Sequence, residues 1–473
     1  MSRQRLLLGI DVGTSGARAI LIDDDGAVLR STAGEYPLHA PRPGWTEQDP
    51  DDWVRVVARC IEDIAAPAGT PIGFTGQMHG SVFLDERDQV IRPALLWNDQ
   101  RTASECAQIE QIVGAETVRR LTGNPALTSF QLPKLLWLRG HEPQHAARVR
   151  AVLLPKDYVR WRVTGERCTD VADASGTGVF DIAQRAWSHT MLQQLEIDPA
   201  LFPPVGESVA TAGAGDQAAG AVGTGAVRDG IVSVSLGTSG VVFASLQQLP
   251  HERDDAVNLF CHATGGWHAM TVMLSAGGAL RWLRETIYQN DASYAEIMNE
   301  AASADGTRED LVFLPYLAGE RSPHNDPAAR GAWVGVSLHH RRAHLARAVV
   351  EGVTFGLLDG LRALERMTGM TPREVRVTGG GARSPFWRQL LADVFGVPVV
   401  TLTCDEGPAF GAAILAGVRA GVWRTVEDAC DVVVKTADRT EPAADRADSA
   451  YAAAYDRFQA LYPLLRSAPR GNG

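Results

Sequence analysis

The tetrapeptide Gly-Thr-Ser-Gly occurs twice in this chain, at residues 13–16 and again at residues 237–240. Each copy follows an apolar, strand-like run (LLLGIDV, then IVSVSL), and each precedes another such run. Glycines at both ends of a tight turn permit positive φ and leave backbone N–H groups accessible to an anion. The repeat therefore predicts a duplicated α/β fold in which a phosphate group is held between two similar halves.

Length and charge narrow the class of protein further. The 473 residues exceed what one hydrophobic core organises, so we expect two large domains, 1–210 and 211–473, divided at the Pro-rich connection of residues 195–211. A net charge of -11 without a basic run argues against a nucleic-acid partner. A polyanion such as ATP must then be held by backbone amides, helix N-termini and a metal ion.

The cysteines and the hydropathy pattern indicate the compartment. The cysteines lie far apart, with no CxxC pair and no His at ligand spacing, at positions 60, 106, 168, 261, 404 and 430. This pattern predicts neither a disulfide framework nor a zinc site. No stretch approaches the roughly 20 apolar residues that a membrane helix needs, and the N-terminal apolar run is too short for a signal peptide. We therefore expect a cytoplasmic protein without a membrane partner.

Local patterns predict several individual elements. Asp52 is expected to cap a helix that begins at Trp53. The segment 133–143 predicts the start of an amphipathic helix, and the small polar residues 170–180 predict a loop near a site. Near the C-terminus, apolar side chains at helical spacing predict a packing helix; they are Tyr451, Tyr455, Phe458 and Leu461.

Two acidic residues stand beside the repeated turns. Asp11 ends an apolar strand just before the first turn, where its carboxylate would need a cation beside a bound phosphate, so it is a candidate Mg²⁺ site; a turn-capping role explains it equally well. Asp216 lies among small residues in GAGDQAAGAVG and is a candidate general base that accepts a proton from a substrate hydroxyl. Taken alone, the segment favours a helix N-cap at Asp216, because N-caps are far commoner than catalytic bases.

Two polar segments follow strands in the first half. The sequence Gln77-Met78-His79-Gly80 offers an amide and an imidazole, which suit a polyol substrate; a hydrogen-bonded histidine beside a hairpin is the alternative. The segment 97–101, WNDQR, adds an aromatic wall and a polar cluster, which a helix cap at Asp99 would also explain.

A glycine-rich turn between a strand and a helix occupies residues 377–387, VTGGGARSPFW. Backbone approaches a planar base or a phosphate closely only where side chains are missing, so this turn is a candidate nucleotide contact, although such a turn alone is a weak signal. The chain has no GxxxxGK[ST], HExxH, GxSxG or complete GxGxxG motif. A Walker-type NTPase is therefore excluded.

Together these segments resemble the FGGY carbohydrate kinases, and among them most closely those that phosphorylate D-xylulose. One family signature is intact over 331–351, and another is recognisable in SFQLPKLLWLRGHE, where Gln131 replaces the usual Pro, Ser or Thr. The likeness spans Leu6 to about Leu465 and includes GIDVGTSG, GQMHG, LLWNDQRT, GAGDQAAGAVG, SLGTSG, YLAGERSPH and GGGARSPFWRQLLADVFG in the expected order. It implies an actin/hexokinase-type fold, two ribonuclease-H-like domains around a central cleft. It also implies ATP-dependent phosphorylation of the terminal hydroxyl of D-xylulose, direct in-line transfer, and ATP and Mg²⁺ as cofactors.

The resemblance assigns roles to residues of this chain. Asp216 would be the catalytic base, and Asp11 would orient Mg²⁺ and the phosphates. The sugar would meet Met78, His79, Trp97, Asp99, Asp216 and Gln217. The nucleotide would meet Thr14, Ser15, Gly237, Thr238, Gly277, Gly380, Gly381 and Ser384.

One departure from the family and two alternative functions remain part of this interpretation. PPVGESVATAGAGDQ runs almost directly into the candidate base, so a strand and a helix that usually bridge the domains are missing; such a deletion is expected to disturb the alignment of Asp216. The substrate could instead be ribulose, arabinitol or glycerol, since pocket shape decides specificity. A non-catalytic ATP-binding protein or an ATPase on the same fold is another alternative. The family also suggests a homodimer.

Overall fold

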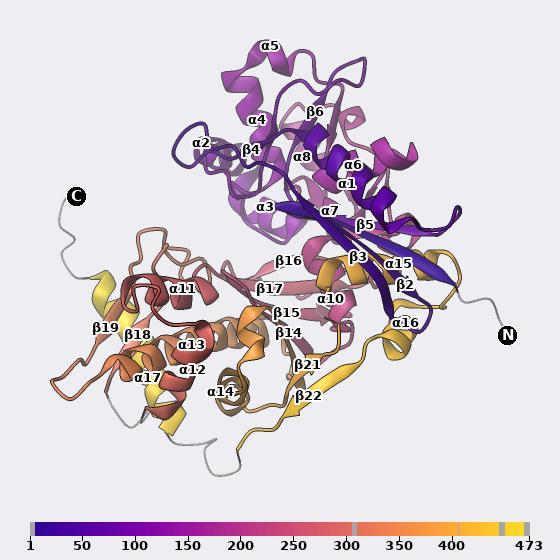
Figure 1. Cartoon of the computed structure of the whole chain (residues 1–473). Coiled ribbons are helices and arrows are strands. Elements are labelled where there is room, and N and C mark those ends of the chain that lie inside the picture. The colour runs from indigo at the N-terminus through magenta and orange to yellow at the C-terminus, as the bar shows by residue number, and fades with distance from the viewer. Residues whose placement is uncertain (1–4, 305–309, 405, 444–449, 468–473) are drawn as a thin grey trace.

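The computed structural model describes residues 5–304, 310–404, 406–443 and 450–467, and two large β-sheets organise it (Figure 1). The first sheet has the strand order β13-β5-β1-β2-β3, and the second has the order β16-β17-β15-β14-β20-β21-β22. The strands of the first sheet are β1 (Leu6–Val12), β2 (Gly16–Asp23), β3 (Val28–Glu35), β5 (Ile72–Gly76) and β13 (Gly213–Gly215). Those of the second are β14 (Ile231–Leu236), β15 (Gly240–Leu246), β16 (Asn258–Cys261), β17 (Trp267–Met273), β20 (Glu374–Thr378), β21 (Val399–Leu402) and β22 (Thr436–Thr440).

The pairing pattern repeats between the two sheets. In the first, β1 pairs antiparallel with β2, β2 antiparallel with β3, and β1 lies parallel to β5, which in turn lies parallel to β13. In the second, β14 and β15 are antiparallel, β15 and β17 are antiparallel, and β14, β20 and β21 run parallel. This is the duplicated ribonuclease-H-like, actin/hexokinase-type fold that the sequence predicts. The boundary between domains 1–210 and 211–473 stays a prediction, and β13 just beyond it completes the first sheet.

The glycines of the repeated turn serve a different purpose from the one predicted. Neither turn contains a residue with positive φ. A Cβ on Gly16 would instead overlap the carbonyl of Gly34, and a Cβ on Gly240 would lie 2.7 Å from a methyl carbon of Leu357. The turns need glycine because backbone and side chains approach closely there.

Two helices join the sheets. The helices α10 (Asp216–Thr224) and α15 (Gly407–Arg419) pack against each other, and α15 also packs against β1 and β5 (Figure 1). The packing is closest at two glycines, since a Cβ on Gly73 or on Gly411 would overlap a carbonyl oxygen of the neighbouring helix. The halves are therefore linked by backbone-to-backbone packing that tolerates no added methyl group.

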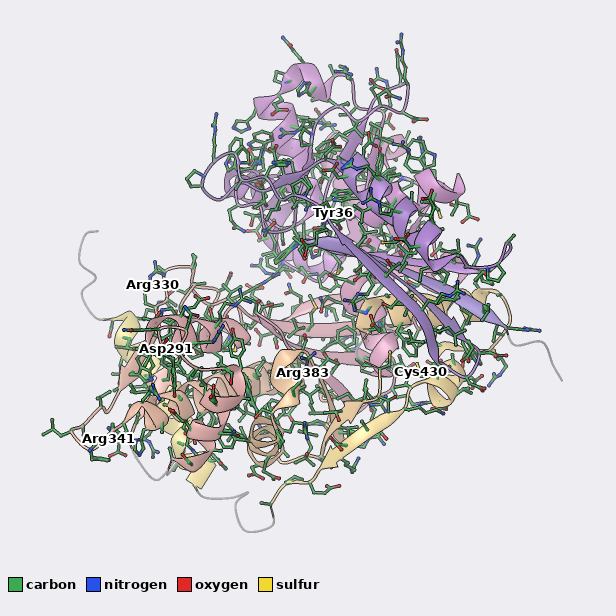
Figure 2. The ribbon with its side chains drawn as sticks, in the orientation of Figure 1. Tyr36, Asp291, Arg330, Arg341, Arg383 and Cys430 are labelled. Carbon is green, nitrogen blue, oxygen red and sulfur yellow. The ribbon has the colours of Figure 1, made fainter. Side chains whose placement is uncertain are left out.

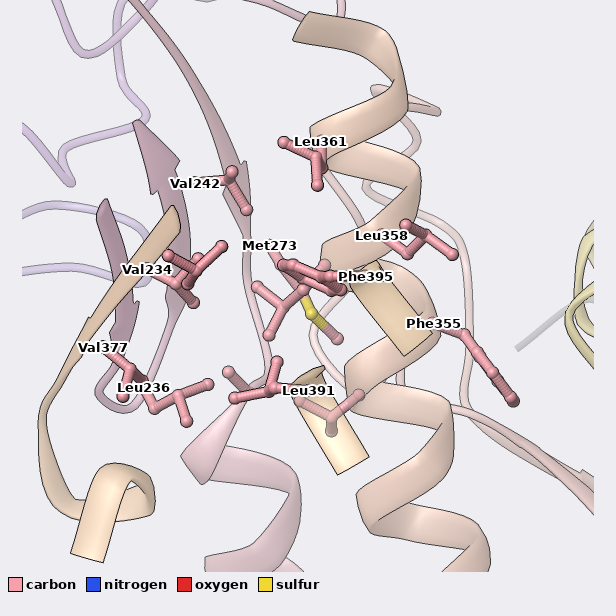
Figure 3. Close-up of a cluster of buried hydrophobic side chains, with 14 of the residues drawn as sticks. Val234, Leu236, Val242, Met273, Phe355, Leu358, Leu361, Val377, Leu391 and Phe395 are labelled. Atoms are coloured by element: carbon pink, nitrogen blue, oxygen red, sulfur yellow. The ribbon is translucent and has the colours of Figure 1, made fainter. Parts of the chain in front are cut away.

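The second half has the largest core. The long helix α13 (Arg342–Thr368) packs against the second sheet, where Leu361 faces Val242 (Figure 3). The helix α17 (Ala450–Arg466) packs against the same core through Tyr451 and Phe458, which confirms the predicted packing helix. The other elements here are α11 (Gly277–Thr286), α12 (Tyr294–Ser303), β18 (Val312–Leu314), β19 (Ala332–Val334), α14 (Pro385–Phe395) and α16 (Val426–Val433).

The first half carries additional short elements around its sheet. They are β4 (Glu47–Gln48), α1 (Pro50–Ile64), β6 (Val82–Leu84), β7 (Ala94–Leu95), α2 (Ala103–Ile109), a π-helical turn (Glu110–Gly114), α3 (Ala115–Thr122), α4 (Gln131–His141), α5 (Pro143–Ala146), β8 (Ala151–Leu153), α6 (Pro155–Thr164), β9 (Thr169–Asp170), α7 (Val171–Ala174), β10 (Phe180–Asp181), β11 (Ala186–Trp187), α8 (His189–Gln194), β12 (Val205–Gly206) and α9 (Ser208–Thr211). No helix among the described residues is both long and apolar enough to span a membrane.

Three local predictions are corrected here. The helix expected to begin at Trp53 begins at Pro50, and its cap is Asp49, whose side chain accepts from the Asp51 N–H. The helix α4 is buried along nearly all of its length rather than amphipathic, because it lies between other elements of the first half. The segment 170–180 is not a plain loop, since it contains the helical turn α7.

Candidate active site

The two candidate carboxylates lie at the same edge of the first sheet. Asp11 is next to the last residue of β1, and Asp216 follows β13 directly as the first residue of α10. Because β1, β5 and β13 run parallel, their carboxyl ends meet at one edge. The N-cap of α10 is Gly215, and Asp216 occupies the first turn without capping it, so the capping alternative does not describe this helix.

Burial raises the pKa of both carboxylates, and Asp216 also acts on Asp11. Burial and the nearby charge of Asp216 raise the pKa of Asp11 to about 7, while Arg18 on β2 opposes that rise. Burial raises the pKa of Asp216 to about 6, and hydrogen bonds from Gln217 oppose it. One oxygen of Asp11 is buried without a hydrogen-bond partner. An unpaired buried carboxylate oxygen next to a second carboxylate is chemically suited to a hard cation.

A small cavity of about 110 Å³ lies beside Asp216. Its wall from the second sheet is rich in hydroxyls, since Ser233, Ser235 and Thr378 lie on neighbouring strands and face the same side. Gln217 lines it as well. The cavity therefore joins the helix that begins with Asp216 to the inner face of the second sheet.

A larger pocket of about 530 Å³ opens in the second half. The second GTSG turn forms one wall, where the N–H of Gly277 donates to the Gly237 carbonyl at 2.8 Å. The triple-glycine turn forms the adjoining wall, where a Cβ on Gly379 would lie 2.6 Å from the Leu236 carbonyl oxygen, and Ser384 caps α14 through the Trp387 N–H. The pocket brings together most of the predicted nucleotide residues, namely Gly237, Thr238, Gly277, Gly380, Gly381 and Ser384. Thr14 and Ser15 lie outside this pocket, on the first turn in the other half.

Several residues of this pocket were missed by sequence reasoning. They are Arg281, Tyr294, Met298, Asn299, Arg383 and Trp387. Most stand on α11 and α12, where a regular helical pattern carries no signal of a ligand. Arg383 lies within the glycine-rich segment and could have been found there.

Figure 2 labels Arg383 in the lower half and Tyr36 in the upper half. The hydroxyl of Tyr36 donates to the Gly13 carbonyl of the first turn.

Met78 and His79 lie near Asp216 in a tightly packed part of the first half. A Cβ on Gly215, which precedes Asp216, would lie 2.7 Å from a side-chain carbon of Met78. His79 has a φ of 69°, and its Nδ1 lies 2.6 Å from the Gly176 carbonyl oxygen. A carbonyl only accepts, so Nδ1 donates and Nε2 is left as an acceptor. Burial lowers the pKa of His79 to about 3, which keeps the ring neutral.

Trp97 and Asp99 are placed differently from each other. Trp97 is 40% exposed, and its Nε1 donates to the Thr14 hydroxyl at 3.0 Å. The Asp99 carboxylate is fully buried in an ion pair with Arg101 and accepts the Thr46 N–H at 2.7 Å. The contact of Asp99 with a sugar stays a prediction. Asp99 caps no helix, since Thr102 is the N-cap of α2.

A buried charge network supports the segment that ends at Gly176, and no sequence motif predicts it. The Lys156 ammonium is fully buried and lies 2.5 Å from Asp157, 2.7 Å from Asp170 and 3.1 Å from Asp173. Asp170 in turn caps α7, the helical turn that leads to Gly176. The network fixes the carbonyl to which His79 donates. Its members were missed because they come from two segments more than ten residues apart, neither of which matches a motif.

Comparisons with known proteins agree with this geometry. The model of the FGGY family of carbohydrate kinases, N-terminal domain, matches residues 6–246, and the C-terminal domain model matches residues 232–420. A xylulose kinase of Escherichia coli is 42% identical over 446 residues, which cover 88% of this chain and 90% of the relative. A xylulose kinase of Staphylococcus epidermidis is 37% identical over 487 residues, with 97% of each chain covered. The crystal structure of a ligand-bound xylulose kinase from Lactobacillus acidophilus superposes with a TM-score of 0.92 at 26% identity, covering 98% of this chain and 99% of the other.

Proposed function

The chain belongs to the FGGY family of carbohydrate kinases, and from that premise we propose that it transfers the γ-phosphoryl group of ATP to the terminal hydroxyl of D-xylulose. The observation that carries the proposal is the Asp11–Asp216 pair at one sheet edge, next to the first GTSG turn. The choice of D-xylulose is supported by relatives that are named xylulose kinases.

Asp216 is the proposed general base. Its pKa of about 6 leaves the carboxylate mostly ionised at neutral pH, and it remains basic enough to accept a hydroxyl proton. As the proton moves to Asp216, the sugar oxygen forms a bond to the γ-phosphorus, and the bond from that phosphorus to the bridging oxygen of ADP breaks. Gln217 donates to the Asp216 carboxylate and holds it in place.

The remaining groups bind and orient the two substrates. The nucleotide base and ribose occupy the pocket of the second half, and the phosphates extend toward Thr14, Ser15 and Thr238 of the two turns. Asp11 would hold Mg²⁺, because its unpaired oxygen is a donor that this ion prefers. When bound, Mg²⁺ neutralises charge on the phosphates. Met78 and His79 contact the sugar, with Nε2 of His79 accepting a hydroxyl hydrogen.

The shortened connection before Asp216 is compatible with activity. The strand β13 has only three residues, yet all three pair with β5. Asp216 still acts on the pKa of Asp11, so the two carboxylates remain close. A homodimer and a cytoplasmic location stay predictions.

The test is a coupled ADP-release assay with MgATP. D-xylulose, D-ribulose, D-arabinitol, glycerol and a blank without sugar are compared at equal concentration. Strong stimulation by D-xylulose supports the proposal, and preference for another polyol keeps the kinase and changes its substrate. ATP turnover that no sugar stimulates would instead favour an ATPase on this fold.

A further inference from the structure

Arg321, in the second half, is held rigidly by the hydrogen bonds of its two neighbours. Arg321 stands between Glu320 and Ser322, and both neighbours are bonded to the end of β17. The Glu320 carboxylate accepts from the Leu274 N–H at 3.0 Å and from the Arg321 N–H at 2.8 Å. The N–H of Ser322 donates to the Val272 carbonyl at 3.0 Å, and the Val272 N–H donates to the Ser322 hydroxyl at 3.1 Å. The backbone of Arg321 is therefore fixed on both sides.

The same strand end lies against the sugar side of the first half. Val272 packs against a buried cluster that includes Phe130 and Phe260. The ring of His79 lies 4.9 Å from the Phe130 ring and 6.0 Å from the Phe260 ring, measured between centroids. The positive charge of Arg321 is close enough to contribute to the lowered pKa of His79. Packing and electrostatics thus independently bring Arg321 of the second half near His79 of the first.

The guanidinium of Arg321 has no anionic partner. Among the described residues, no carboxylate forms an ion pair with it, in contrast to Arg92, Arg101 and Arg347, each of which is paired. Burial lowers the pKa of Arg321 to about 10, and no neighbouring acid offsets that effect. Removing a cation from water without an acceptor is costly, so its N–H donors are available to a ligand.

Arg321 and Asp216 are suited to different oxygens of the sugar. Asp216 is the proposed base for the terminal hydroxyl, so a hydrogen-bond donor near His79 is available to the remaining oxygens. Arginine offers several donors in a fixed planar arrangement, and the neutral His79 offers an acceptor beside them.

We propose that Arg321 is a substrate-contacting residue that donates hydrogen bonds to sugar oxygens other than the phosphorylated hydroxyl. The inference rests on the proposed sugar-kinase function and extends it to a residue that recognises the unreacting oxygens. It adds to Asp216 and Gln217 a further sugar contact from the second half, next to the end of β17.

The test compares Arg321→Gln and Arg321→Lys with the wild type. Titration calorimetry measures D-xylulose binding without ATP, and steady-state kinetics measure KM for each substrate. We expect Arg321→Gln to weaken sugar binding by about 10- to 100-fold, since charged hydrogen bonds are lost, while KM for ATP changes less than about threefold. Arg321→Lys keeps the charge and is expected to recover part of the affinity. Arg330→Gln is the matched control, because Arg330 is exposed and its guanidinium bonds only to nearby carbonyls.

The outcomes separate the two proposals. Unchanged sugar affinity in a folded Arg321→Gln or Arg321→Lys protein overturns the role of Arg321, and so does a defect confined to the KM for ATP. Thermal melting of each variant establishes that it is folded, and the lysine variant serves if the glutamine variant is not. Absence of sugar-stimulated ADP release by the wild type instead rejects the proposed function itself.

Discussion

Replacing Asp216 with Asn tests the proposed chemistry most directly. The carboxamide has nearly the same shape and still accepts from Gln217, but it cannot take a proton from the sugar. With a pKa of about 6, Asp216 is ionised in the large majority of molecules at pH 7.5, so the wild type works near its full capacity there. A general base contributes about 100- to 10,000-fold, which corresponds to about 3–5 kcal/mol of barrier height. We expect kcat to fall by that factor while KM for D-xylulose changes little.

The assay is coupled ADP release with saturating MgATP, supported by calorimetric titration of the sugar. Asp431→Asn is a matched control, since Asp431 is an exposed carboxylate paired with Arg228 far from the site. A kcat within about threefold of the wild type would refute the assignment of Asp216 as the base.

Four further predictions follow from the structure. As pH falls through about 6, Asp216 gains a proton and kcat/KM should drop tenfold per pH unit; a profile that stays flat to pH 5 contradicts this. Burial lowers the pKa of Lys134 to about 7, so between pH 7 and the ordinary value of 10.5 the unfolded chain binds more protons. The wild type should therefore gain stability relative to Lys134→Met as pH rises across that range. The difference between their urea unfolding midpoints is measured at pH 7 and at pH 9.5, and an equal difference at both pH values would disprove the prediction. Gly73→Ala should cost about 2 kcal/mol or more because its methyl group overlaps a carbonyl of α15, whereas Gly140→Ala meets no atom within 4 Å and should be neutral in the same thermal melts. Ala295→Trp should fill part of the larger pocket and raise KM for ATP at least about tenfold without changing sugar affinity. If the variant and the wild type have the same KM for ATP, the nucleotide binds elsewhere.

The sequence predicts the fold well because its signals are local and repeated. Each GTSG turn joins two apolar runs, and a tight turn between strands forces antiparallel pairing whatever surrounds it. The second turn and the triple glycine converge on one pocket, because turns that follow neighbouring parallel strands emerge at the same edge of a sheet. Asp11 and Asp216 are found for the same reason.

Only the tertiary structure decides which polar side chains are available to a ligand. Asp99 is a candidate sugar contact in the sequence, and the structure adds that its carboxylate forms a buried ion pair with Arg101. Arg321 has no distinguishing pattern in the sequence, yet it is a half-buried cation that pairs with no acid among the described residues. Ion pairs form between residues that are distant in sequence and adjacent in space. A local sequence pattern does not show which distant residues become neighbours. The repeated strands and turns therefore determine the fold, whereas tertiary packing determines which charges are paired and which are free to bind.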